Sequence, residues 1–232
     1  MSSGDHMGHS TWRGLASLAV ISTATFGLQV HSSGAPVHTC FGHPATIIGT
    51  PGDDTLTGTP GADVIVGLEG NDTIRGLAGN DLLCGDDGAD VLRGGRGADH
   101  LAGSRGADRL SGQRGVDILR GGSDADTLRG GRKGDKVSGG SGHDFLKGAR
   151  GADRIAGGAD DDALRGGKGG DMLFGSLGND SILAGTGPDH LSGGEGDDSL
   201  NAQDGVPDDI VRGGAGTDSC LADSGDVVNS CP

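Results

Sequence analysis

A nine-residue repeat runs without insertion through most of this chain and constrains its fold more than any other feature. The 153 residues of Gly49–Asn201 divide into 17 units of nine, among them GLEGNDTIR and GLAGNDLLC. The first residue of each unit is Gly, with the exception of Ala184. The fourth is Gly except at Asp124, Lys133 and Asp160. Such a short, fixed period predicts a stack of similar coils rather than an irregular globular core.

The sixth and eighth positions are the most regular in side-chain chemistry. The sixth residue is Asp in every unit, and the eighth is always aliphatic, with Val137 the least bulky. Strand side chains alternate in direction, so a triplet such as Thr73-Ile74-Arg75 predicts a short strand with its central residue facing inward. The preceding six residues should form a turn, and we expect two glycines in it to adopt positive φ.

The unit resembles the nonapeptide G-G-x-G-x-D-x-U-x of RTX (repeats-in-toxin, haemolysin-type) calcium-binding proteins. The resemblance covers about two thirds of the chain. It implies an all-β fold, a right-handed parallel β-roll or β-helix solenoid with two units per coil. Odd units would stack on one sheet and even units on the other. The array would then contain about eight coils.

The resemblance also implies a metal site. Calcium takes about six to eight oxygen ligands from carboxylates and backbone carbonyls, and in this family each ion lies between turns of neighbouring coils. The side-chain ligands would be the sixth-position Asp residues and two later Asp residues with similar spacing. These are Asp54, Asp63, Asp72, Asp81, Asp90, Asp99, Asp108, Asp117, Asp126, Asp135, Asp144, Asp153, Asp162, Asp171, Asp180, Asp189, Asp198, Asp209 and Asp218. We therefore predict several calcium ions as cofactors.

Folding energetics indicate that calcium is needed for the array to fold. One buried aliphatic side chain per unit contributes about 1.5–3 kcal/mol, whereas ordering nine residues costs about 1–2 kcal/mol each. Stacked Asp side chains also repel one another. We expect a disordered metal-free chain that folds when calcium binds. Turns that border Lys133 should bind most weakly, unless that loop rearranges around Gly134 and still binds.

The segments outside the array predict export and capping. Residues 1–35 resemble a secretory signal, with an uncharged apolar run at Leu15–Val30 that is short for a membrane span. The alternative is a buried or amphipathic N-terminal segment. Residues 36–48 would form an N-terminal cap, residues 49–201 the repeat roll, and residues 202–232 a final repeat with a C-terminal cap. We expect a secreted, extracellular protein with no membrane span in the mature chain.

Four cysteines lie at or beyond the ends of the array. An even number in an exported chain favours disulfides, and nearness in sequence predicts the pairs Cys40–Cys84 and Cys220–Cys231. Free thiols are the alternative. Zinc coordination by the cysteines is a weaker alternative, because no close Cys/His pair recurs at ligand spacing.

The net charge of the chain and the residues at its outward-facing strand positions indicate which binding partners to expect. The net charge of −15, mostly from fixed repeat positions, favours cations over nucleic acid as partners. The ninth position of odd units nevertheless forms a basic stripe of Arg75, Arg93, Arg129, Lys147 and Arg165, interrupted by Ser111. It either offsets the acidic turns or binds an anionic partner such as a polysaccharide, a lipid headgroup or a nucleic acid. On the other sheet we expect apolar patches at Val64, Val66 and Leu82 and near Met172 and Phe174.

Together these features predict a secreted calcium-binding β-roll without catalysis. The chain contains neither an HExxH nor a GxSxG motif, and no compact domain remains outside the array to hold an active site. The alternative is an extracellular adhesin or matrix protein that uses the basic stripe for an anionic glycan or cell-surface partner, with calcium as a structural staple. An enzyme with a cryptic site is the third class.

Overall fold

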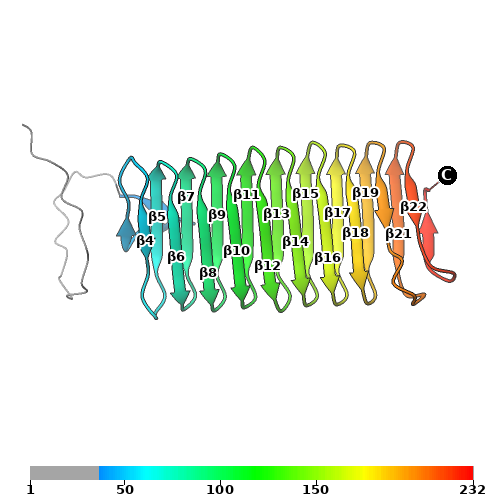
Figure 1. The fold of residues 1–232 in the computed structure, drawn as a ribbon, viewed down its shortest axis with the longest axis horizontal. Coiled ribbons are helices and arrows are strands. Elements are labelled where there is room, and N and C mark those ends of the chain that lie inside the picture. Colours follow the sequence, from blue (N-terminus) through cyan, green and yellow to red (C-terminus); the bar gives the residue numbers. More distant parts are fainter. Residues whose placement is uncertain (1–36, 232) are drawn as a thin grey trace, which may run out of the picture. The chain divides into compact units, whose positions relative to one another are not determined.

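The computed structural model describes residues 37–231, which fold into a solenoid of stacked β-coils (Figure 1). The strands follow one another along the stack in sequence order, from β4 near one end to β22 near the other. The predicted signal segment, residues 1–35, lies outside the described residues. Within residues 37–231, no helix has the length and apolar character needed to cross a membrane.

Two parallel sheets form the solenoid. The even-numbered sheet contains β4 (Thr55–Thr57), β6 (Thr73–Ala78), β8 (Val91–Arg96), β10 (Arg109–Arg114), β12 (Thr127–Arg132), β14 (Phe145–Arg150), β16 (Ala163–Lys168), β18 (Ser181–Thr186), β20 (Ser199–Asn201) and β22 (Ser219–Leu221). The odd-numbered sheet contains β3 (Ile47–Ile48), β5 (Val64–Glu69), β7 (Leu82–Asp87), β9 (His100–Arg105), β11 (Ile118–Ser123), β13 (Lys136–Ser141), β15 (Arg154–Ala159), β17 (Met172–Leu177), β19 (His190–Glu195), β21 (Ile210–Ala215) and β23 (Val227–Asn229). Odd and even units therefore alternate between the two sheets, as the sequence predicts.

The register between strands is one full coil of 18 residues. Leu110 of β10 lies opposite Leu128 of β12, and Leu119 of β11 lies opposite Val137 of β13. Both pairs are parallel, so equivalent positions of every second unit stack along the solenoid. The predicted parallel β-roll is confirmed.

Two local predictions were wrong. Most strands span six residues rather than three, because the first three residues of the next unit also pair with the neighbouring coil. The positive-φ positions are the second and fourth, as at Leu77 (φ 82°) and Gly79 (φ 125°), rather than the first and fourth. The first-position Gly is needed instead because a side chain there would meet the Asp carboxylate of its own turn.

A single column of aliphatic side chains from each sheet fills the interior. The eighth-position residues are almost completely buried. They are Ile65, Ile74, Leu83, Leu92, Leu101, Leu110, Leu119, Leu128, Val137, Leu146, Ile155, Leu164, Leu173, Ile182, Leu191 and Leu200, and Val211 continues the series. Each contacts only its own and adjacent coils, so the core is a ladder rather than a cluster.

Truncation of this ladder should be costly. We predict that Leu119→Ala lowers the unfolding free energy of the calcium-bound roll by about 2–5 kcal/mol, because Leu119 is fully buried and the cavity cannot collapse between fixed strands. Thermal unfolding followed by circular dichroism measures the effect. The matched control is Leu183→Ala, since Leu183 is 40% exposed. Equal destabilisation by both substitutions would contradict the ladder as the source of stability.

The N-terminal segment covers an apolar surface that the sequence predicted to be exposed. The strand β1 (Thr39–Cys40), which pairs antiparallel with β2 (His43–Pro44), packs on β5 and β7, and Cys40 forms the predicted disulfide with Cys84. Val66 is buried beneath it. The exposed patch at Val64, Val66 and Leu82 was therefore a wrong prediction, because these side chains pack against Cys40, Phe41 and Ala45.

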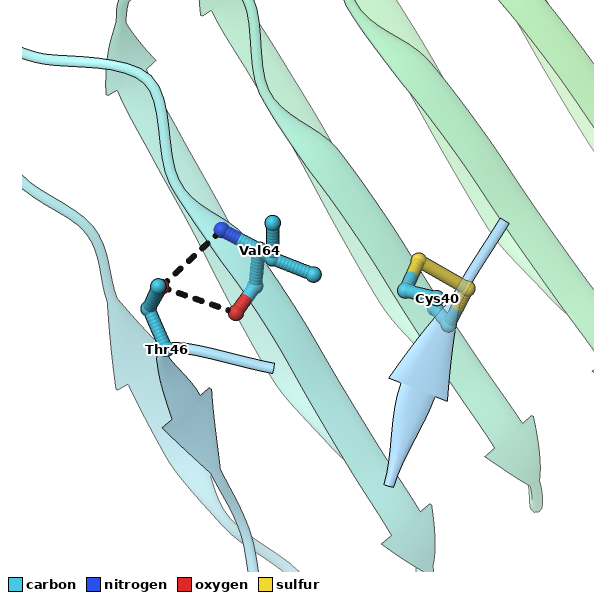
Figure 2. The surroundings of a disulfide bond; sticks show 4 residues. Cys40, Thr46 and Val64 are labelled. Carbon is cyan, nitrogen blue, oxygen red and sulfur yellow. Dashed lines mark hydrogen bonds between the residues drawn. A yellow bond between two sulfur atoms is a disulfide. The ribbon is translucent and has the colours of Figure 1, made fainter. Parts of the chain in front are cut away.

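A second contact holds this segment in register with the roll. The Thr46 hydroxyl donates to the Val64 carbonyl and accepts from the Val64 amide, both at 3.0 Å, close to the disulfide (Figure 2). Ile47 then lies opposite Ile65 and packs against the core as the first rung of the ladder.

The second predicted apolar patch, near Met172 and Phe174, is also partly covered. The Arg154 guanidinium lies 4.4 Å from the centre of the Phe174 ring.

The C-terminal segment continues both sheets beyond the regular array. The predicted Cys220–Cys231 disulfide is present, and both residues pack against the core. Residues 202–209 contain the two extra residues, so the step from Asp189 to Asp209 is 20 residues instead of 18. The strands on either side, β19 and β21, nevertheless pair in the normal register.

Candidate metal centre

The sixth-position Asp residues form two rows of linked carboxylates, one along each edge of the solenoid. The Asp90 amide donates to Oδ1 of Asp108 at 2.8 Å, and the Asp108 amide donates to Oδ1 of Asp126 at 2.7 Å. One row contains Asp54, Asp72, Asp90, Asp108, Asp126, Asp144, Asp162, Asp180, Asp198 and Asp218. The other contains Asp63, Asp81, Asp99, Asp117, Asp135, Asp153, Asp171, Asp189 and Asp209. Every predicted ligand therefore lies in one of the rows.

The second oxygen of these carboxylates is buried without a hydrogen-bond partner. This holds for Oδ2 of 17 residues, from Asp72 through Asp218. A buried carboxylate oxygen without a donor is strongly unfavourable, and its repetition from Asp72 onward favours cation binding in these turns.

Most of the orphaned oxygens face a backbone carbonyl across the first-position Gly. A Cβ added to Gly85 would come against Oδ2 of Asp90 and lie 3.0 Å from the Gly103 carbonyl oxygen. The same pair of oxygen types surrounds the first-position Gly of most other units. Glycine is required here because a methyl group would fill the space between the two oxygens. Carboxylate and carbonyl oxygens are the ligands that calcium prefers, so these residues fit the metal.

The two N-terminal units differ from the rest. Oδ2 of Asp54 accepts hydrogen bonds from the Thr50 amide and hydroxyl, at 2.6 and 2.9 Å. Oδ2 of Asp63 accepts the corresponding bonds from Thr59 at 2.6 and 3.0 Å. Both Asp residues belong to the predicted ligand set, but threonine donors already satisfy the oxygen that is orphaned elsewhere.

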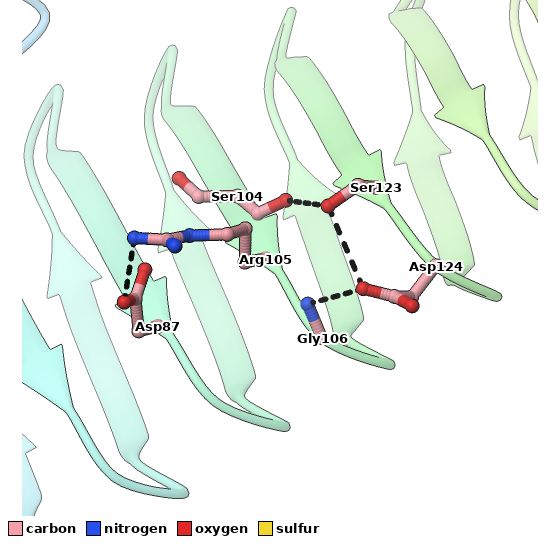
Figure 3. A network of polar contacts seen from close by, with 6 residues as sticks. All are labelled: Asp87, Ser104, Arg105, Gly106, Ser123 and Asp124. Atoms are coloured by element: carbon pink, nitrogen blue, oxygen red, sulfur yellow. Dashed lines mark hydrogen bonds and ion pairs between the residues drawn. The ribbon is translucent and has the colours of Figure 1, made fainter.

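Substituted fourth positions keep the turn conformation. Asp124, Lys133 and Asp160 all have φ of 76–77°. The Asp124 carboxylate accepts from the Gly106 amide at 3.1 Å and contacts the Ser123 hydroxyl, which bonds to the Ser104 carbonyl (Figure 3). The Asp135 row on either side of Lys133 is intact, with bonds of 2.8 Å, so that loop does not rearrange. Weak calcium binding near Lys133 stays a prediction.

Sequence reasoning missed acidic residues near the C-terminus. Oδ1 of Asp226 accepts from the Asp209 amide at 3.1 Å and extends the second row by one rung. Asp204 and Asp208 bring carboxylate oxygens within 4.8 Å of one another and of Asp209. Asp226 is followed by Val227 and Val228, which resembles the D-x-aliphatic pattern of the repeat, but a change of spacing hides it from a strict period of nine.

Burial raises the pKa of most ladder carboxyls, and like-charged neighbours raise it further. The pKa of Asp108 rises to about 8 through desolvation, opposed by the hydrogen bond from the Asp90 amide and reinforced by the charges of Asp126, Asp90 and Asp124. The same causes raise the pKa of Asp126 and Asp135 to about 7. The metal-free folded roll therefore favours neutral carboxyl groups.

We predict that the metal-free roll becomes more stable as the pH falls. The raised pKa values mean that the folded chain binds protons which the unfolded chain, with carboxyl pKa values of about 3.9, has released. This stabilisation is fully present below about pH 4 and is lost as the pH rises through about 6 to 8. Circular dichroism in a chelator across this range tests the sign. An equally unfolded chain at both ends of the range would contradict it.

A parallel β-solenoid whose turns present paired carboxylate and carbonyl oxygens on every coil is a calcium-binding β-roll. The family model of the RTX calcium-binding nonapeptide repeat, which describes four copies, matches residues 48–83, 85–119, 111–146, 120–155, 138–173, 174–206 and 208–227. The chain therefore belongs to the RTX calcium-binding nonapeptide repeat family. No curated protein matches the chain.

Proposed function

We propose that this chain is a secreted protein that binds several calcium ions, folds into its β-roll on binding them, and catalyses no reaction. The single observation that carries the proposal is the set of 17 buried Asp Oδ2 atoms without partners, which are divided between the two rows. So many buried carboxylates in one small fold would oppose folding unless cations neutralised them. Calcium supplies the neutralising positive charge and is coordinated by backbone carbonyl oxygens as well as by carboxylates.

The ligands in this proposal are the sixth-position carboxylates and the carbonyls of the first-position residues one coil further along. The central turns, from Asp72 to Asp198, offer an orphaned oxygen at each step. Asp54 and Asp63 would contribute less, because Thr50 and Thr59 already donate to them. The chemistry that calcium supplies is charge neutralisation and cross-linking of neighbouring coils.

Secretion and capping form part of the same proposal. Two disulfides favour an oxidising compartment, and extracellular calcium sites typically bind at about 10⁻⁴–10⁻³ M, so they would be empty before export and filled after it. Residues 36–48 and 202–232 would act as caps. Support comes from the packing of β1 on β5 and β7, and from the pairing of β21 with β23.

The experiment is a calcium titration of the purified, metal-stripped chain followed by far-UV circular dichroism, with magnesium as the control. A cooperative change from coil to β-structure with calcium alone is expected. Isothermal titration calorimetry on the same samples counts the ions bound. A fully β-structured metal-free chain at neutral pH would overturn the proposal, because the aliphatic ladder and the disulfides would then be sufficient for folding.

A further inference from the structure

The outer face of the even-numbered sheet carries two columns of basic residues. The first is the predicted ninth-position stripe, in which Arg75, Arg93, Ser111, Arg129, Lys147 and Arg165 lie opposite one another on successive strands. The second was missed by sequence reasoning. It is formed by the third position of even units, which the extended strands also bring into register, and consists of Arg96, Arg114, Arg132, Arg150 and Lys168.

A groove separates the two columns. Its floor consists of the second-position residues Gln113, Gly131, Ala149 and Gly167, which lie opposite one another on β10 to β16. Two adjoining depressions of about 500 and 300 Å³ are lined by this floor and by basic residues of both columns. The floor is low from β12 to β16 because its residues there are Gly131, Ala149 and Gly167, and the positive φ of the second position favours glycine.

The basic groove has no internal counter-charge. Among residues 37–231 the one ion pair joins Arg105 to Asp87 on the odd-numbered sheet. The even-numbered strands from β6 to β16 contain no acidic residue. Most of the basic side chains are exposed. Stacked like charges on neighbouring strands destabilise a sheet, so both columns lower the stability of the fold that contains them.

We propose that this groove binds a linear acidic polysaccharide lying along the solenoid axis. Basic residues recur on both walls at the strand spacing of about 4.8 Å, which is comparable with the length of one sugar residue in an extended chain. A polysaccharide with regularly spaced carboxylates or sulfates can therefore contact two basic side chains on each of β8, β12, β14 and β16, and one on β10, where Ser111 interrupts the first column. The proposal uses the calcium-folded roll as its scaffold.

The shape of the groove favours this occupant over other polyanions. Single-stranded nucleic acids gain much of their affinity from bases stacked on aromatic side chains, and the floor from Gln113 to Gly167 offers none. A membrane surface presents a plane of headgroups, whereas the two columns flank one narrow trough. The acidic turns lie along the edges of the solenoid and would repel a polyanion that is broader than the groove.

The test measures binding of labelled heparin and hyaluronan fragments to the full chain in saturating calcium, by fluorescence anisotropy. The groove variant is Arg114→Ser/Arg132→Ser/Arg150→Ser. The matched control is Arg120→Ser/Lys136→Ser/Arg212→Ser, which removes the same charge from exposed positions of the odd-numbered sheet. Heparin offers sulfates and hyaluronan carboxylates, so the two probes distinguish the acidic group. Neutral dextran, oligo-dT and phosphatidylserine vesicles complete the set.

We expect at least one acidic saccharide to bind, with affinity that falls as salt rises, and no binding of neutral dextran. The groove variant should weaken binding by about tenfold or more and the control by less than about twofold, since only the former removes contacts. Equal losses in both variants would overturn the proposal, as would binding of oligo-dT or vesicles without either saccharide, or no binding to the folded chain. Circular dichroism on the same samples separates these outcomes from a failure of calcium-dependent folding.

Discussion

The substitution Gly103→Ala is expected to destabilise the calcium-bound roll by about 3 kcal/mol or more, because it overpacks a site with fixed walls. A Cβ on Gly103 would approach Oδ2 of Asp108 and lie 2.8 Å from the Gly121 carbonyl oxygen. The strand register fixes that carbonyl, and the Asp90 amide fixes the carboxylate. The methyl group would also occupy the space proposed for calcium. Thermal unfolding at saturating calcium and the midpoint of the calcium titration should both change.

The chain offers matched comparisons for this substitution. A Cβ on Gly52 would meet no atom within 4 Å, so Gly52→Ala should change stability by less than about 0.5 kcal/mol. First-position residues along the edge that contains Gly103 are all Gly, whereas the other edge ends in Ala184, Ala202 and Ala222, which pack against the core. If Gly103→Ala unfolds at the wild-type temperature, the oxygen pair around Gly103 is not a constrained site.

The substitution Asp108→Asn is expected to act in opposite directions with and without calcium. With calcium, binding at that turn should weaken by about tenfold or more, since a charged ligand becomes neutral. Without calcium, the variant should retain more β-structure than the wild type, because the buried charge is gone. The Asn oxygen can still accept from the Asp90 amide, and its NH₂ group can donate to the Gly121 carbonyl in place of the orphaned Oδ2.

Calorimetry in calcium and circular dichroism in a chelator together measure both effects. The control is Asp54→Asn, whose Oδ2 already accepts two bonds from Thr50, and which should leave calcium binding close to that of the wild type. A loss of β-structure in Asp108→Asn both with and without calcium would show that the carboxylate is needed for the backbone bond alone. That result would remove the main support for metal binding in the turns.

Much of this fold follows directly from the repeat. A period of nine with one aliphatic residue at the eighth position predicts a stacked ladder as the core. The alternation of units such as those of Leu110 and Leu119 between two sheets was implied by the resemblance to RTX proteins. Both disulfides were predictable from nearness in sequence, because the cysteines lie at the two ends of the stack.

Other features depend on contacts that no single unit contains. Oδ2 of Asp108 has no partner, whereas Oδ1 accepts a hydrogen bond from the Asp90 amide of the adjacent coil. The sequence of one unit does not show this difference between the two oxygens. Arg132 joins the basic face because its strand extends past the first-position Gly, which the outward alternation of a three-residue strand does not show. Val66 is buried because the segment that contains Cys40 folds back over the sheet. The repeat pattern does not predict the path of that segment.

The alternation of sheets links the length of the array to the placement of its charges. Deleting or duplicating 18 residues would remove or add one whole coil and leave every later side chain on its original face. Deleting nine would exchange the faces beyond the cut, so that a later Arg132 or Arg150 would move to the opposite sheet and divide the groove. The two extra residues before Asp209 avoid this exchange, since β21 still pairs with β19. An array of this kind can therefore change its length by whole coils without interrupting its basic face, but not by single repeats.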